Sequence, residues 1–296
     1  MQHHRLSWVP LAWVILGWAT AAPCATYTDA MGRQVSLDRQ PQRIVTLAPN
    51  LTEIVYFLGL GDRVVGVTQY SGYPPEAADK PRVGSFVDLN VERIISLAPD
   101  LVLGTADGNP RKTVSLLERA GVPVYVLNPR SIREVIDSLV TVGRLCGVVA
   151  RAAELAAGLS ARIDAVVQRT AALERPLVFL QVNPRPIVTV NQNTFLHDLI
   201  RLAGGENMAQ DEPMSYPRMS VEEVVRKRPD VIIISSMGQG GGSEEARQYW
   251  LRWTPIPAVR HGRVHVVDSD LIDRPSPRIV QGLERLARYL HPEVAW

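Results

Sequence analysis

Two glutamates stand at equivalent places in two similar stretches of this sequence. Glu92 comes two residues after Asn90, and Glu222 comes two residues after Ser220. Because Asn and Ser are good helix N-caps, each carboxylate falls in the first turn of a predicted helix, where it interacts favourably with the helix dipole. Carboxylates repeated on two halves of a chain could also pair with basic residues of a two-fold symmetric partner. The residues alone leave both interpretations open.

Three aromatic side chains occur in turns, outside any periodic core pattern. Tyr73 lies in the run YSGYPP, Phe86 follows Gly84-Ser85, and Tyr216 precedes a proline. Each ring could simply fill a gap beneath its own loop. Together, aromatic residues in turns of both halves indicate a bulky, partly apolar ligand.

The sequence holds no convincing enzyme motif. It contains neither the phosphate-binding pattern GxxxxGK[ST] nor the nucleophile pattern G-x-S-x-G, and the glycine-rich run 238–243 fails G-x-G-x-x-G because its last residue is Ser243. The histidines are scattered, without the spacing of a metal site. We therefore predict a protein that is not an enzyme and that needs no cofactor or protein-bound metal. A two-domain α/β enzyme with a cleft active site is the rival class.

An internal duplication organises the chain. Three pairs of similar segments follow one another in the same order, roughly 140 residues apart, which indicates two domains of one design. The pairs are 90–103 with 220–233, strand 44–46 with strand 187–189 together with the helices that follow them, and strand 124–127 with strand 264–267.

Each half alternates short apolar runs with amphipathic helices, the pattern of a mainly parallel sheet covered on both faces. Residues 148–174 between the halves are rich in Ala, Leu, Arg and Glu and lack proline, so they predict one long helix. The predicted fold is α/β, with two Rossmann-like lobes joined by that helix. We place the first lobe at 26–145, the linking helix at 146–175 and the second lobe at 176–296. A stiff bridge would let the lobes rock only by small angles.

The N-terminus, residues 1–25, reads as a signal peptide. A short basic start precedes an apolar stretch at 6–22, which is shorter than a membrane span and ends in small residues. We therefore predict a periplasmic protein. Lipid attachment at Cys24 is the alternative, although Pro23 is a poor fit to a lipidation signal. Cys146 lies in an apolar helical stretch and is predicted to be a buried thiol.

The composition is that of a soluble globular protein. The chain has 296 residues, of which 46% are apolar and 21% are charged, and its formal net charge is +2. No run of Lys and Arg forms a basic stripe, so we predict no nucleic-acid partner.

The motifs of residues 43–290 resemble the helical-backbone (class III) substrate-binding proteins of ABC importers, a periplasmic binding protein family that carries cobalamin, haem and ferric siderophores. The runs YSGYPP and RPSPRI indicate the cobalamin branch of that family. The segments that carry the resemblance are YSGYPP at 70–75, NVERI at 90–94, PDLV at 99–102, GGEN at 204–207, QYW at 248–250 and RPSPRI at 274–279.

The resemblance implies that two lobes hold the ligand in a shallow cleft. Three aromatic residues would line the corrinoid, and one Asp and one Arg would lie on the rim of the second lobe. The positions thus assigned to the ligand are Tyr73, Phe86, Tyr216, Asp270 and Arg274. Thr105 and Leu271 stand where the cobalamin branch has tryptophans, so the aromatic area is smaller here.

The resemblance also implies a function and partners. The protein would act as a monomer that captures cobalamin or a related corrinoid and delivers it to an ABC permease dimer, with Glu92 and Glu222 forming salt bridges to the permease. Haem or a ferric siderophore is the alternative ligand. Haem would use an axial Tyr73 or Tyr216, whereas a siderophore would need cleft arginines such as Arg218 and Arg274.

Overall fold

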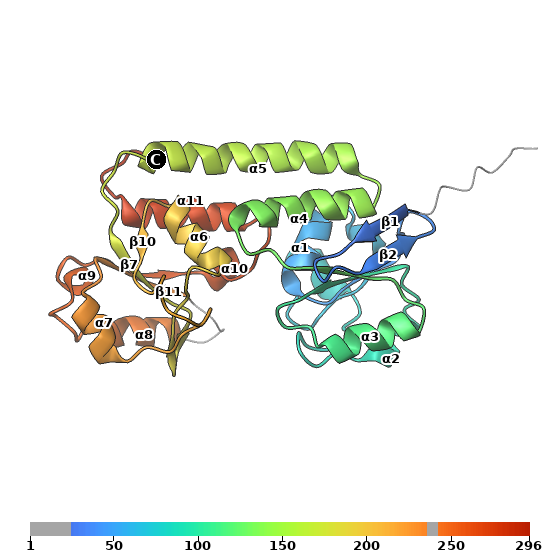
Figure 1. The fold of residues 1–296 in the computed structure, drawn as a ribbon, viewed down its shortest axis with the longest axis horizontal. Helices are drawn as coiled ribbons and strands as arrows, with labels where there is room; N and C mark the ends of the chain where they lie inside the picture. The colour runs from blue at the N-terminus through green and yellow to red at the C-terminus, as the bar shows by residue number, and fades with distance from the viewer. Residues whose placement is uncertain (1–24, 236–241) are drawn as a thin grey trace, which may run out of the picture.

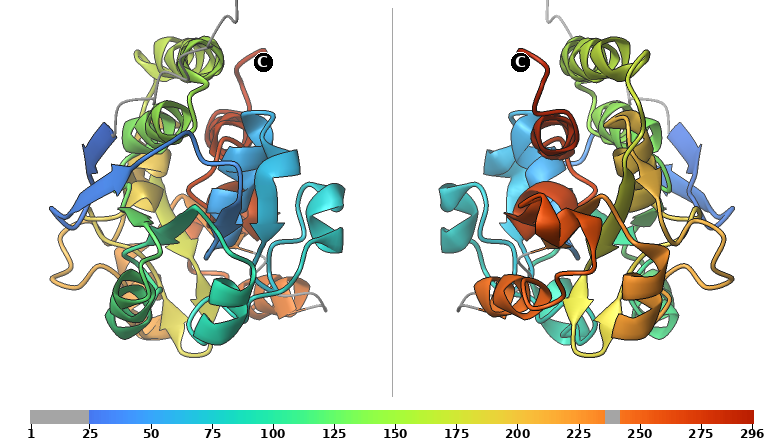
Figure 2. Two further views of the ribbon diagram at one scale, coloured as in Figure 1. Left: turned by 90° about the vertical axis from the view of Figure 1, so that its right-hand side faces the viewer. Right: turned by 90° about the vertical axis from the view of Figure 1, so that its left-hand side faces the viewer.

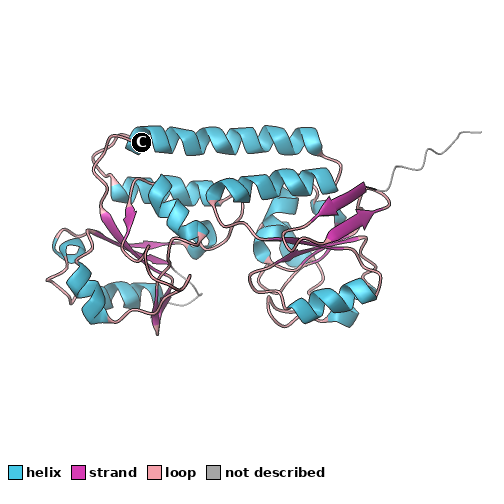
Figure 3. Cartoon of the chain, in the orientation of Figure 1, coloured by secondary structure: helices cyan, strands magenta, loops and turns pink. Residues whose placement is uncertain are grey.

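Two α/β lobes lie side by side beneath one long helix. The computed structural model describes residues 25–235 and 242–296. In Figure 1 the N-terminal lobe is on the right, the C-terminal lobe is on the left, and α5 (Val149–Thr170) runs along the top of both. Helices cover both faces of each sheet (Figure 3). The predicted fold of two Rossmann-like lobes joined by one helix is confirmed.

The first lobe is built on a parallel sheet with the strand order β4-β3-β5-β6. A hairpin of β1 and β2 precedes it. The strands are β1 (Ala25–Thr28), β2 (Gln34–Leu37), β3 (Ile44–Thr46), β4 (Val64–Gly66), β5 (Leu101–Thr105) and β6 (Val124–Leu127). The helices are α1 (Pro49–Phe57), α2 (Val91–Ser96), α3 (Arg111–Arg119) and α4 (Ile132–Leu145), with 3-10 turns at Gly61–Arg63 and Pro75–Asp79.

The second lobe repeats this design with the strand order β10-β7-β11-β12, again parallel. Its strands are β7 (Leu177–Gln181), β10 (Glu206–Asn207), β11 (Val231–Ser235) and β12 (Val264–Val267), with a hairpin of β8 (Asn183–Pro184) and β9 (Ile187–Val188). Its helices are α6 (Phe195–Leu202), α7 (Val221–Lys227), α8 (Gly242–Trp250), α9 (Pro257–Arg260), α10 (Ser269–Ile272) and α11 (Ile279–Leu290).

The Pro-Asp turn before the third strand of each sheet has the same geometry in both lobes. The N–H of Asp100 donates to the carbonyl of Arg43 at 2.9 Å, and the N–H of Asp230 donates to the carbonyl of Leu177 at 2.8 Å. The two carboxylates accept from the N–H groups of those same partners, at 2.8 and 2.9 Å. Each Asp therefore fixes the start of the neighbouring strand, and the duplication is visible in the hydrogen bonds.

One predicted pair of repeats is wrong. The turns align Arg43 with Leu177, so strand 44–46 corresponds to residues 178–180 of β7. Residues 187–189 instead begin in β9, which pairs antiparallel with β8 outside the main sheet. The prediction failed because a hairpin is inserted between β7 and α6, and its second strand is as apolar as β3.

The linking helix α5 is continuous over 22 residues, from Val149 to Thr170, and is about 33 Å long at the usual helical rise. It ends four residues before the predicted Glu174. Seen from either end, α5 lies on α4 and α11 (Figure 2). Arg162 of α5 also forms a two-bond ion pair with Glu284 of α11, at 2.9 Å for each bond. The bridge is thus anchored to both lobes.

One hydrophobic cluster extends through both lobes. It joins Leu51 and Leu103 of the first lobe to α4 and α5, and continues to Leu180 and Leu283 of the second lobe. Two smaller clusters fill the far sides of the sheets. Cys146 is fully buried in the large cluster, as predicted, and burial raises the pKa of its thiol to about 12.

Residues 1–24 of the predicted signal peptide, Cys24 among them, lie outside the described residues, and Ala25 is the first residue of β1. Within 25–235 and 242–296, no helix combines the length and the apolar character that crossing a bilayer requires. The division into 26–145, 146–175 and 176–296 stays a prediction.

Candidate functional site

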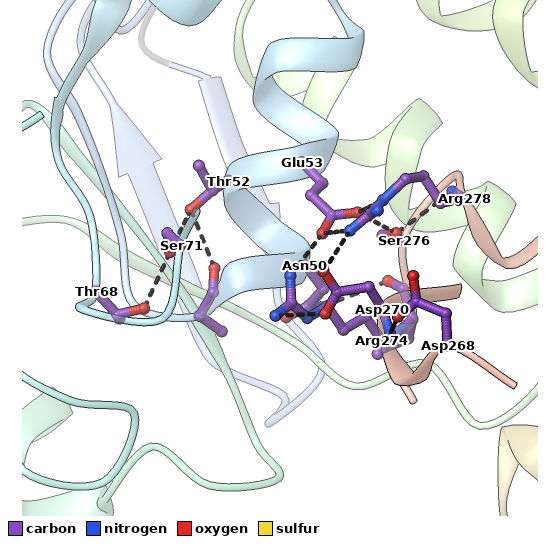
Figure 4. Close-up of polar contacts among 12 residues, drawn as sticks. Asn50, Thr52, Glu53, Thr68, Ser71, Asp268, Asp270, Arg274, Ser276 and Arg278 are labelled. Carbon is purple, nitrogen blue, oxygen red and sulfur yellow. Dashed lines mark hydrogen bonds and ion pairs between the residues drawn. The ribbon is translucent and has the colours of Figure 1, made fainter. Parts of the chain in front are cut away.

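A buried carboxylate of the first lobe ties the two lobes together. The side chain of Glu53, on α1, is only 2% exposed. Its oxygens accept hydrogen bonds from Arg274 Nη1 at 3.1 Å, from Ser276 Oγ at 2.6 Å, and from Arg278 Nε and Nη2 at 2.9 and 2.7 Å (Figure 4). All three donors belong to the segment between α10 and α11. Charge-assisted hydrogen bonds of this kind offset the desolvation of a buried carboxylate.

The same segment brings three predicted ligand residues together. Asp270 pairs with Arg274 at 2.8 Å and approaches Arg278 at 3.5 Å. The guanidinium carbon of Arg278 lies 3.9 Å from the centre of the Tyr73 ring, a cation–π contact between the lobes. We call the set Glu53, Asp270, Arg274, Ser276 and Arg278 the interlobe ion-pair network. Through it, Tyr73 of the first lobe is linked to Asp270 and Arg274 of the second.

A chain of buried hydroxyl groups positions the loop that holds Tyr73. Ser71 Oγ lies 2.9 Å from Thr52 Oγ1 on α1 and 3.0 Å from Thr68 Oγ1 (Figure 4). Arg82 Nη1 donates to the carbonyls of Thr68 and Ser71 at 2.9 and 3.0 Å. The backbone just before Tyr73 is therefore fixed, while 43% of the surface of Tyr73 remains exposed.

The loop of Tyr216 is held in a different way, by backbone hydrogen bonds to the segment after β9. The N–H of Thr189 donates to the carbonyl of Pro217, and the N–H of Asn191 donates to the carbonyl of Ser215, both at 3.0 Å. Tyr216 sits between these two anchored residues and stays 44% exposed.

Charged groups of both lobes affect the pKa of Tyr216. Burial is the main cause that raises the pKa of this tyrosine, and the carboxylates of Asp107 and Asp273 raise it further, while Arg130 opposes them. Asp107 and Arg130 form an ion pair with bonds of 2.6 and 3.0 Å on the first lobe. Tyr216, on the second lobe, therefore lies within electrostatic range of the first.

Phe86 is half-buried and packs against its own lobe. The φ of Gly108 is +116°, and a Cβ there would lie 1.8 Å from Cε1 of the Phe86 ring, so only glycine fits. The carbonyl of Phe86 accepts from Asn109 Nδ2 at 3.0 Å. This geometry fits the interpretation that the ring fills space beneath its loop, and a ligand contact by Phe86 stays a prediction.

Large apolar side chains remain exposed in the same loops. They are Tyr70, Tyr73 and Val87 on the first lobe and Met214 and Tyr216 on the second. A hollow of about 460 Å³ lies between the lobes, lined by Arg130 of the first and by Gln192, Asn193 and Ser215 of the second. Exposed apolar groups with polar neighbours are typical of a ligand-binding cleft.

Asp273 is a partly buried acid beside the network. Ser235 Oγ, at the end of β11, donates to Asp273 Oδ2. Its other oxygen, Oδ1, is inaccessible to water and has no hydrogen-bond partner among the described residues. Burial raises the pKa of Asp273 to about 7, against the opposing effects of Ser235 and Arg274.

Glu92 and Glu222 are both exposed and stand in the first turns of α2 and α7, as predicted. Asn90 and Ser220 are the N-caps, each accepting from a backbone N–H. In the described part of the chain, neither glutamate side chain has a hydrogen-bond or ion-pair partner. Both helices lie on the side of their lobes away from α5 (Figure 1).

Sequence reasoning missed several of these residues. Glu53, Val87 and Met214 were not predicted, and Arg278 was noted only as part of RPSPRI. The signal for Arg278 was therefore present in that motif. Glu53 gave no signal, because its partners lie 221 to 225 residues away along the chain.

The arrangement is suited to holding a ligand. The described residues contain no group of three or more His, Cys, Asp and Glu side chains that could hold a metal ion. Each lobe presents exposed apolar side chains on loops that are fixed by hydrogen bonds, and the interlobe ion-pair network lies between the lobes. Fold and site together define a two-lobed binding protein braced by a helix.

Comparison with known proteins agrees with this class. Residues 44–271 match the family described as periplasmic binding protein. An uncharacterised ABC transporter substrate-binding lipoprotein, YvrC of Bacillus subtilis, is 34% identical over 90% of this chain and 86% of its own length. The periplasmic vitamin B12 binding protein BtuF of Vibrio cholerae has a similar structure, with a TM-score of 0.73 and 29% identity over 85% of this chain and 97% of that one. A periplasmic heme binding protein from Pseudomonas aeruginosa gives a TM-score of 0.77 and 28% identity over 86% of this chain and 94% of that one.

The chain belongs to the periplasmic binding protein family. These relatives are named as binding proteins, one of them as part of an ABC transporter, and not as enzymes, in agreement with the class predicted from the sequence.

Proposed function

We propose that this protein captures cobalamin or a related corrinoid between its lobes. The observation that supports this most is the placement of Tyr73 and Tyr216. They come from different lobes and stay exposed, and the Tyr73 ring also contacts Arg278 of the second lobe. Two amphipathic rings on fixed loops offer a large flat ligand contact area at little entropic cost. The similarity to vitamin B12-binding proteins of Vibrio supports the same ligand.

The proposal includes export and delivery. The N-terminal sequence favours a periplasmic protein released by signal cleavage, and the lipoprotein relative keeps attachment through Cys24 as the alternative. Delivery would be to an ABC permease dimer, with Glu92 and Glu222 docking on basic residues of the two permease subunits.

The proposal is tested by calorimetric titration of the purified protein with cyanocobalamin. We expect binding with one site per chain, and about tenfold weaker binding after Tyr73→Ala or Tyr216→Ala, because each removes an aromatic anchor. The matched controls are Tyr73→Phe and Tyr216→Phe, which keep the rings and should bind almost as well as the original protein. Absence of heat at high micromolar ligand would contradict the proposal.

Haem is the second candidate, since structural relatives include heme-binding proteins. Haem would take Tyr73 or Tyr216 as its axial ligand, and tyrosinate is the strongly binding form of that side chain. The raised pKa of Tyr216 works against that form. The two phenylalanine variants separate the candidates. A Soret shift with haemin that Tyr→Phe abolishes would favour haem, while corrinoid binding that survives Tyr→Phe favours cobalamin.

A further inference from the structure

The two arginines between the lobes are both paired with carboxylates of the protein itself. Arg278 gives two hydrogen bonds to Glu53 and lies over the Tyr73 ring, and only 14% of its side chain is exposed. Arg274 divides its donors between Glu53 and Asp270, with 24% of its side chain exposed. The charges of these four ionised side chains therefore cancel, two against two.

Of the two carboxylates, Glu53 does more than Asp270 to neutralise the arginines. It accepts four hydrogen bonds and is almost inaccessible to water, whereas Asp270 is 37% exposed. Two adjacent guanidinium groups without Glu53 would form a typical binding site for an anion, because their planar donors match carboxylate and catecholate oxygens. With Glu53 present, an anionic ligand would have to compete with a buried carboxylate for the same donors.

We propose that Glu53 is a specificity-determining residue that makes the cleft reject anionic metal chelates and accept a ligand without net charge. It acts by accepting hydrogen bonds from Arg274 and Arg278. An anionic chelate then finds these guanidinium donors already in use and binds more weakly. The inference builds on the proposed function, because cyanocobalamin is neutral overall while haem and many ferric siderophores are anionic. Residues that contact the ligand would then determine the affinity, and Glu53 would determine which net charge of the ligand the cleft accepts.

The test compares two iron complexes of similar size and different charge. A ferric tris-hydroxamate is neutral, and a ferric tris-catecholate is trianionic. We expect Glu53→Gln, which keeps the side-chain shape, to bind the tris-catecholate at least about tenfold more tightly than the original protein does. Affinity for the neutral tris-hydroxamate should change less than about threefold, and the gain should shrink when salt rises from about 0.01 to about 0.5 M.

Three further variants separate the effect of charge from a simple loss of structure. Asp270→Asn removes the more exposed negative charge of the network and leaves Glu53 in place, so it should give a smaller gain in the same direction. Glu53→Gln combined with Arg274→Gln restores the balance of charge and should lose the gain, although it disturbs the network more. Glu284→Gln breaks the Arg162 pair on α11 and is the matched control, with no expected change.

The outcomes separate the two proposals. Equal changes for both iron complexes, or no tris-catecholate binding by Glu53→Gln and Asp270→Asn at millimolar concentration, would overturn the role of Glu53. Cyanocobalamin is titrated into the same proteins. If the original protein fails to bind cyanocobalamin while Glu53→Gln gains tris-catecholate binding, the corrinoid proposal falls and the charge-selection role stands.

Discussion

Asp273 is the residue whose environment departs most from that of a carboxylate in water. Although part of the residue is exposed, its Oδ1 is buried without a partner among the described residues, and the pKa of the group is raised to about 7. A carboxyl group with a raised pKa binds its proton more tightly in the folded chain than in the unfolded one. Its contribution to stability is therefore complete below the unfolded pKa of about 4, and it is lost as the pH rises toward 7.

Asp273→Asn should remove this pH-dependent loss, because the amide has the shape of the protonated acid and does not ionise. We expect the variant and the original protein to have similar free energies of unfolding near pH 4. Above pH 7 the variant should be more stable by about 1 to 3 kcal/mol. Urea unfolding at pH 4 to 8 measures the difference, and a constant difference across this range would show that Asp273 titrates normally.

At the residue scale, the sequence indicated those roles that depend on neighbours in the chain. Asn90 and Ser220 were identifiable as N-caps because their partners are three residues away. The turn aromatics Tyr73 and Tyr216 were recognisable because they interrupt polar, proline-containing runs. Glu53 was not recognisable, since in the sequence it is one charged residue in an apolar helix, and its role depends on how two distant lobes pack.

At the scale of elements, the contact of α4 with α5 depends on one small residue. Gly143 of α4 is buried, and a Cβ added there would lie 2.2 Å from the Cβ of Ala152 on α5. Gly158, on the exposed side of α5, has nothing within 4 Å of the same added atom. The same substitution should therefore have opposite effects at the two positions.

Gly143→Ala should destabilise the protein by about 1 to 3 kcal/mol, because overpacking separates the helices. Gly158→Ala should stabilise it by about 0.5 to 1 kcal/mol, because alanine has the higher helix propensity. Chemical denaturation of both variants provides the comparison. If Gly143→Ala were as stabilising as Gly158→Ala, the helices would not be in the close contact described.

Individual helices and strands were easier to predict than which element of one lobe corresponds to which element of the other. The helix 148–174 was visible in a long proline-free, alanine-rich run, and the Pro-Asp turns marked β5 and β11 in both halves. Strand 187–189 was wrongly taken as the counterpart of strand 44–46, because β-branched residues alone do not show which sheet a strand joins. The true counterpart of strand 44–46 is β7, which became evident only from the backbone contacts of Asp230 with Leu177.

At the scale of the whole molecule, Glu92 and Glu222 provide a test of delivery separate from capture. The double variant Glu92→Arg and Glu222→Arg should reduce transport at least about tenfold, because like charges would face the basic residues of the permease. Each single variant should have a partial effect. Uptake of labelled cyanocobalamin into vesicles that contain the permease is the measurement.

Glu174→Arg is the matched control for that experiment, because Glu174 is also exposed but follows shortly after α5, a helix on the opposite side of the molecule from α2 and α7. It should transport normally. Titration with cyanocobalamin should give the same affinity for the original protein and for all four variants. Normal transport by the double variant would exclude docking through these glutamates, and a loss of ligand binding would point to a structural effect.

The continuous hydrophobic cluster has a consequence for how the protein melts. Since Leu51, Leu103, Leu180 and Leu283 belong to one cluster that runs through α4 and α5, neither half has a complete interior of its own. The halves should therefore lose structure together, as one cooperative unit. Scanning calorimetry should record a single endotherm whose calorimetric and van't Hoff enthalpies agree. Either half synthesised alone should be insoluble or protease-sensitive, since the apolar surface that meets the other half would be left open to water.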